Sequence, residues 1–130
     1  SRYTWFPDGK EVTVACGEDG IIANFPIAGG DRRTVVRLKD AGIDLAGWPR
    51  WSPDGRLLAF QGESPRDSKF YVYQVDNANL QPLSDNYAPP FYWSPDSKWI
   101  CYYTRETVKT RPEGVLWEMD VDEAVAKLAE

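Results

Sequence analysis

A threefold repeat dominates the sequence. An aromatic residue, a Pro-Asp turn and an apolar run occur together three times, at Trp5-Phe-Pro-Asp-Gly-Lys, Trp51-Ser-Pro-Asp-Gly-Arg and Trp93-Ser-Pro-Asp-Ser-Lys. Their starting points lie 46 and 42 residues apart, a period typical of arrays in which each unit is too small to bury its own hydrophobic surface. The chain must therefore stack its repeats against one another to form a core.

The central repeat shows what the signature does locally. Pro53 presets φ for the first central position of a turn, Asp54 suits the second and bonds nearby backbone, and Gly55 accepts positive φ. The following run, 56–60, is almost continuously apolar, which indicates a strand covered on both faces. The same structural turn motif is expected in all three repeats, at Trp5, Pro7, Asp8, Gly9, Trp51, Pro53, Asp54, Gly55, Trp93, Pro95 and Asp96.

Two positions depart from this pattern. Phe6 stands where the other two repeats have Ser, and Ser97 replaces the turn glycine. Ser97 must therefore accept a strained left-handed conformation, or its turn must close by another geometry.

Each repeat continues with further strand-like segments. In the second, 69–75 and 80–83 follow the turn, and Pro82 places the last strand at a sheet edge, where a missing N–H does no harm. We predict an all-β fold of about three four-stranded antiparallel sheets forming one domain, 1–130. The units are expected at about 1–39, 47–84 and 89–121.

The third unit ends differently from the other two. Asp120 can cap a helix, and Val121, Val125 and Leu128 recur at helical spacing. We expect a short amphipathic helix at about 121–130 in place of a fourth strand. Its expected role is to cap an exposed sheet edge, and docking of a partner is the alternative.

Composition excludes several classes of chemistry. The chain has no histidine, so Ser-His-Asp and Cys-His catalysis and histidine-ligated metals are excluded within it. The turn carboxylates Asp8, Asp54 and Asp96 recur once per repeat, which favours turn closure over metal ligation. We expect neither a metal nor a cofactor, and no catalytic residue.

Charge and hydropathy restrict the partners. The 15 basic and 20 acidic residues give a net charge of −5, and no basic block could follow a phosphate backbone, so no nucleic acid is expected. No apolar stretch approaches the length of about 18 residues that a membrane span requires. Two cysteines, Cys16 and Cys101, are too few for a disulfide framework and are expected to be buried free thiols.

The repeats resemble a known family. The Trp-Ser-Pro-Asp-Gly-Arg signature, with an apolar run and later a strand such as Tyr73-Gln-Val-Asp76 or Trp117-Glu-Met-Asp120, is similar to the WD40-like (PD40) β-propeller repeat of the TolB family. The resemblance implies propeller blades in a non-catalytic scaffold that binds a protein partner or peptide. It favours a bacterial, periplasmic or extracytoplasmic setting and leaves a cytoplasmic one open.

Similar repeats occur in larger enzymes, so two other roles stay open. One is a substrate-gating accessory segment of a peptidase or polysaccharide lyase, and the other is a carbohydrate-binding module.

Three blades are too few for a closed ring, because propellers use about four to eight. Either further blades come from the same parent chain, or two copies form a homodimer that completes a six-bladed ring.

Ligands of propellers bind at the mouth of the central channel, which the segments before each anchor Trp are expected to line. The candidate binding residues are Trp48, Arg50, Tyr87, Phe91 and Tyr92.

Overall fold

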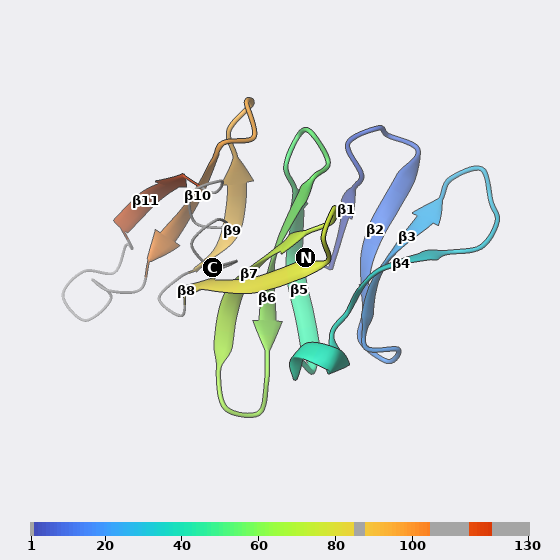
Figure 1. Ribbon diagram of the computed structural model, residues 1–130, viewed down its shortest axis with the longest axis horizontal. Helices are drawn as coiled ribbons and strands as arrows, with labels where there is room; N and C mark the ends of the chain where they lie inside the picture. Colours follow the sequence, from blue (N-terminus) through green and yellow to red (C-terminus); the bar gives the residue numbers. More distant parts are fainter. Residues whose placement is uncertain (1, 85–87, 105–114, 121–130) are drawn as a thin grey trace.

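The computed structural model describes residues 2–84, 88–104 and 115–120, which form three antiparallel sheets (Figure 1). The first sheet has the order β1 (Tyr3–Trp5), β2 (Glu11–Cys16), β3 (Ile21–Pro26) and β4 (Arg33–Arg37). The second has the order β5 (Leu45–Trp51), β6 (Leu57–Glu63), β7 (Ser68–Gln74) and β8 (Asn79–Ser84). The third joins β9 (Ala88–Trp93), β10 (Trp99–Thr104) and β11 (Val115–Asp120), with β10 in the middle. The all-β prediction is confirmed.

The repeated signature forms the turn between the first and second strands of each sheet. Gly9 and Gly55 occupy the left-handed position with φ of 73° and 76°, and Ser97 occupies it with φ of 64°. Ser97 therefore adopts the strained conformation, which is one of the two alternatives that its sequence position left open. Its hydroxyl accepts a hydrogen bond from the backbone N–H of Asp54 at 3.1 Å, which links the turns of the second and third sheets.

The turn aspartates close their own turns. The side chains of Asp8, Asp54 and Asp96 each accept a hydrogen bond from the backbone N–H two residues later. Ser52 and Ser94 add a second bond by donating to the carboxylates of Asp54 and Asp96. Phe6 cannot make this bond, and its ring instead forms a T-shaped contact with Trp51, with a centroid distance of 4.8 Å.

The sheets stack so that β5 contacts both β1 and β9, and the second sheet lies between the other two (Figure 1). Residues 57–60 of β6 are all buried. Leu57 and Ala59 join the core shared with the third sheet, whereas Leu58 and Phe60 join the core shared with the first. This alternation confirms the prediction of a strand covered on both faces.

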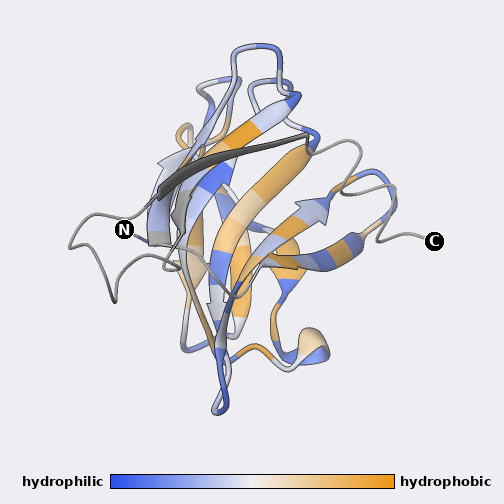
Figure 2. Ribbon diagram, turned by 90° about the vertical axis from the view of Figure 1, so that its left-hand side faces the viewer, coloured by the Kyte–Doolittle hydropathy of each residue, from blue (hydrophilic) through white to orange (hydrophobic). Residues whose placement is uncertain are grey.

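Hydrophobic residues lie mainly on the strands, and the loops between them are largely hydrophilic (Figure 2).

Several further expectations can be compared with the structure. β8, which contains Pro82, is an edge strand as predicted. A short 3₁₀ helix, Lys39–Ala41, connects the first and second sheets. Neither cysteine forms a disulfide bond, and both are half-buried rather than buried, because each lies on an outward-facing side of an end sheet. The helix expected at 121–130 lies outside the described residues.

The anchor tryptophans join neighbouring sheets. Trp51 is 8% exposed, and its indole N–H donates to the Thr13 hydroxyl of the first sheet at 2.6 Å. The indole N–H of Trp93 donates to the Arg50 carbonyl of the second sheet at 2.9 Å. Trp5 is 60% exposed, because no described segment packs on the side of the first sheet that carries it.

Candidate binding site on an innermost strand

A bulge in β5 positions two of the predicted binding residues. The pairing of β5 with β6 runs from Gly47 opposite Gln61 to Arg50 opposite Ala59, so Trp48 and Pro49 share a single opposing position. Trp48 takes a left-handed conformation with φ of 53°, which is uncommon for a bulky residue. Strain of this kind costs on the order of 1–3 kcal/mol and concentrates at functional sites. The bulge therefore marks β5 as a site worth testing.

The bulge places an aromatic ring and a cation together. The guanidinium carbon of Arg50 lies 5.9 Å from the centre of the Trp48 ring, within cation–π range. The Arg50 guanidinium also donates to the carbonyl of Pro49 at 2.8 Å. Both side chains are half-buried, so part of each remains available to a ligand. Within the described part of the chain, Arg50 forms no ion pair with a carboxylate.

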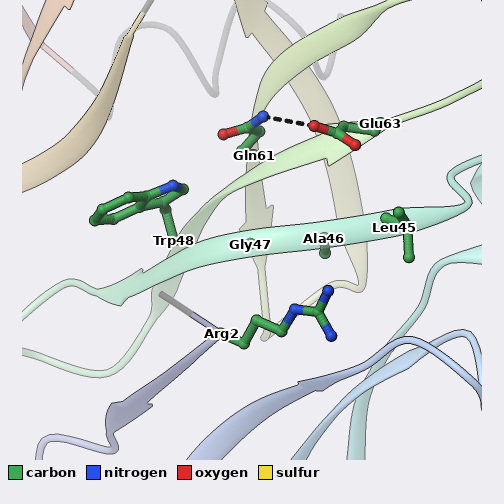
Figure 3. Close-up of a pocket in the computed structure, with 7 residues that line it drawn as sticks. All are labelled: Arg2, Leu45, Ala46, Gly47, Trp48, Gln61 and Glu63. Atoms are coloured by element: carbon green, nitrogen blue, oxygen red, sulfur yellow. Dashed lines mark hydrogen bonds between the residues drawn. The ribbon is translucent and has the colours of Figure 1, made fainter.

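A pocket of about 190 Å³ opens beside the bulge, between the first and second sheets (Figure 3). Arg2 lies on one side of β5, and Gln61 and Glu63 lie on the other. The Gln61 amide donates to the Glu63 carboxylate at 3.0 Å, whereas the Arg2 side chain has no charged partner among the described residues. The rest of the pocket lining comes from β5, at Leu45, Ala46, Gly47 and Trp48. The site thus combines an aromatic face with two arginines that have no carboxylate partner among the described residues.

The structure separates the other predicted binding residues from this pair. Phe91 is fully buried and stacks on Phe70 with ring centroids 4.3 Å apart. It is a core residue between the second and third sheets, which corrects its assignment to the binding set. Tyr92 is 60% exposed and lines a different pocket of about 240 Å³, with Trp99 and Cys101. Tyr87 lies outside the described residues.

A second groove, of about 620 Å³, was not predicted from the sequence. It runs between β4 of the first sheet and the β7–β8 hairpin of the second, where the sheets diverge. Leu80 and Tyr73 line it, together with Asn79, whose side-chain nitrogen is buried without a hydrogen-bond partner. In the turn before β8, Ala78 takes a left-handed conformation with φ of 53°. The groove depends on how the sheets stack, which no short motif encodes.

Several ionisable groups have shifted pKa values, and the shifts have structural causes. Burial alone would raise the pKa of the Asp54 carboxyl, but hydrogen bonds from Ser52 and Arg56 lower it overall. The Ser94 hydroxyl and the backbone N–H of Lys98 lower the pKa of Asp96. Burial raises the pKa of Tyr73, whose side chain lies beside the outer groove. In the described ranges, no three acidic or cysteine side chains come together in a cluster suited to a metal ion.

No helix within the described residues has the length and apolar character needed to cross a membrane.

Comparison with solved structures identifies the stacked sheets. TolB from Acinetobacter baumannii matches with a TM-score of 0.70 and 18% identity, over 92% of this chain and 29% of that one. The tricorn protease matches with a TM-score of 0.60 and 16% identity, over 82% and 11% of the two chains. The β-propeller domain of the Trilobed protease from Pyrococcus furiosus matches with a TM-score of 0.57 and 21% identity, over 88% and 36%.

No protein-family model and no curated protein matches the sequence. The chain spans between 11% and 36% of the structures named above. At these identities the likeness concerns the fold alone. The three sheets have the fold of β-propeller blades, as in TolB.

Proposed function

We propose that this chain is a non-catalytic segment of a β-propeller that binds a peptide segment of a protein partner. The observation that carries the proposal is the strained bulge of β5, which holds Trp48 beside Arg50 at a pocket on an innermost strand. Aromatic and arginine side chains are the types that dominate binding energy in protein interfaces. A fixed aromatic ring also loses little conformational entropy when a ligand covers it.

The charges at this site indicate the chemistry of the ligand. Arg2 lines the pocket and Arg50 lies against Trp48, which also lines it; neither arginine has a carboxylate partner among the described residues, and Glu63 is already engaged by Gln61. A peptide carboxylate can pair with either guanidinium, and an aromatic or proline residue can stack on Trp48. We therefore infer a preference for an acidic peptide that also contains a ring.

Selection of peptides tests this proposal. A displayed library of random peptides is selected on the immobilised chain, and the enriched peptides are measured by titration calorimetry. We expect acidic, ring-containing peptides whose affinity falls at least tenfold, about 1.4 kcal/mol, in Trp48→Asn and in Arg50→Gln. Asparagine tolerates the left-handed backbone at 48, so the variant adds no backbone strain, and circular dichroism checks that it folds although Trp48 packs against the core. Arg66→Gln, an exposed arginine on a loop of the same sheet, is the matched control.

Enrichment of peptides that bind all three variants equally would contradict the site, and failure to enrich any peptide would contradict the proposed function. A parallel panel of immobilised glycans addresses the carbohydrate alternative. Glycan binding that depends on Trp48, without peptide binding, would replace the protein partner with a sugar.

The comparisons support a second candidate function. Propellers of the tricorn and Trilobed proteases share this fold, and the chain spans only part of each. A segment that gates substrate access to a peptidase is consistent with that likeness. The full reading frame around this sequence tests it: a downstream Gly-x-Ser-x-Gly elbow favours the peptidase accessory, and a secretion signal with further propeller repeats favours the periplasmic scaffold.

A further inference from the structure

The two end blades each expose an apolar face. On the first blade, Trp5 pairs with Val12, and Val12 with Phe25, so their side chains share the face opposite Thr13, which contacts the second blade. We call this the leading face. Trp5 and Phe25 on it are 60% and 36% exposed, and Tyr3, two residues before Trp5, is 67% exposed.

The third blade presents the complementary surface, which we call the trailing face. Tyr92 pairs with Cys101 on the side opposite Phe91 and Ile100, both of which are buried against the second blade. Tyr92 and Trp99 are 60% and 43% exposed there. The two faces lie at opposite ends of the stack, because the second blade separates the first from the third (Figure 1).

The repeat itself indicates what covers the leading face. Trp51 and Trp93 occupy the same position in their blades, and each indole N–H donates to the blade that precedes it. Trp5 occupies that position in the first blade, and its indole N–H has no acceptor among the described residues. The partner of the leading face is therefore another blade, placed as the first is placed against the second.

We propose that this blade is the third blade of a second copy of the chain. The acceptor for Trp93 is the carbonyl of Arg50, the residue directly before Trp51. The residue in the same position of the third blade is Tyr92, directly before Trp93. In the proposed contact, the indole N–H of Trp5 donates to the Tyr92 carbonyl of the second copy, and the side chains of Tyr3 and Trp5 pack on the apolar trailing face.

Ring closure favours this arrangement over other contacts between copies. Two chains of three blades give six, which lies within the range of about four to eight found in closed propellers. A twofold axis along the channel brings each leading face onto the other copy's trailing face and leaves neither uncovered. A contact between two leading faces would leave both trailing faces exposed to water.

Sedimentation equilibrium at micromolar concentration tests the proposal. The chain should have twice the mass of one copy, which is 14.8 kDa. Trp5→Arg and Trp99→Arg should each sediment as a monomer, because each places a charge in both interfaces of the ring. Val75→Arg, a partly exposed apolar position on the second blade, is the control and should remain a dimer. Circular dichroism should show that all three variants retain the wild-type sheet signal.

Mixing the two monomeric variants gives the sharper result. The Trp5→Arg chain keeps its trailing face and the Trp99→Arg chain keeps its leading face, so a mixed dimer has one intact interface. We expect the dimer to reappear in the mixture with weaker affinity than in the wild type. Should either variant fail to fold, hydrogen exchange of wild-type β1 decides, because its amides should gain protection as the concentration rises.

Three outcomes would overturn the inference. A monomeric wild type in which hydrogen-exchange protection of β1 does not depend on concentration would show that no second copy covers the leading face, and would favour a blade from a longer chain. A dimer that survives Trp5→Arg would place the contact elsewhere. A mass that grows beyond two copies would contradict ring closure.

Discussion

Trp51 gives a quantitative test of how the blades are joined. Its ring is 8% exposed between the first and second blades, and its indole N–H donates to Thr13 at 2.6 Å. Thr13 is fully buried and in turn donates its hydroxyl proton to Asn24, also fully buried. Substitution of Trp51 therefore affects both the packing of the interface and a polar network that water cannot reach.

Two substitutions separate these contributions. Trp51→Phe keeps most of the ring and removes the N–H, which leaves the buried Thr13 oxygen short of a donor at a cost of about 1–3 kcal/mol. Trp51→Ala removes the ring, for which buried Trp positions lose about 3–5 kcal/mol. Trp51→Ala also removes the T-shaped contact with Phe6. Such aromatic pairs contribute about 0.5–1.5 kcal/mol beyond their buried area, and part of this is already included in the 3–5 kcal/mol for loss of the ring.

Urea unfolding followed by far-ultraviolet circular dichroism measures both effects at one protein concentration. We expect the unfolding midpoint to fall in the order wild type, Trp51→Phe, Trp51→Ala, with the alanine variant unfolded or aggregated at physiological temperature. Arg50→Ala is the control and should cost no more than about 1 kcal/mol, because the described contacts of that side chain are a hydrogen bond to the neighbouring carbonyl and a cation–π contact with Trp48. An alanine variant as stable as the wild type would refute stacking through the anchor tryptophans.

Three further predictions follow from single positions. Gly62→Ala should cost about 1–3 kcal/mol in urea unfolding, because its methyl group would lie 2.6 Å from the ring of Tyr71; unchanged stability would contradict that close packing. Ser97→Ala should be less stable than Ser97→Gly by about 1 kcal/mol, because both lose the bond from the Asp54 N–H but only glycine relieves the positive φ; the reverse order in thermal melts would refute strain there. The pKa values of Asp54 and Asp96 are lowered in the fold, so the stabilisation by these carboxylates is present above the usual carboxyl pKa of about 3.9 and is lost as the pH falls through the folded-state values. In unfolding titrations from neutral to acidic pH, the variant with both aspartates replaced by Asn should therefore lose stability less steeply than the wild type.

The local structure of this chain could be read from the sequence because its rules are short-range. Pro and Asp set the turns, and the position of Ser97 in its repeat left two alternatives, of which the structure contains the left-handed one. The continuous apolar run after Gly55 predicted a strand buried on both sides, and β6 is such a strand. Pro82 predicted an edge strand, and β8 is one.

The candidate site could be predicted only in part. Trp48 and Arg50 were identified from their place before an anchor tryptophan, but the bulge that holds them together has no sequence signal of its own. Phe91 and Tyr92 are adjacent and both aromatic, yet one is core and the other surface. Strand alternation means that a shift of one residue in register would exchange them, and register depends on pairing with β10.

The sequence by itself determined the turns, the strands and their repetition, because these depend on the conformational preferences of residues that are close together in the chain. Only the tertiary structure decided the environment of each repeat. Trp5 and Trp51 begin the same motif, but one is exposed and the other is buried. The difference arises because burial requires a neighbouring sheet, which the stacking of distant segments supplies to Trp51 and not to Trp5.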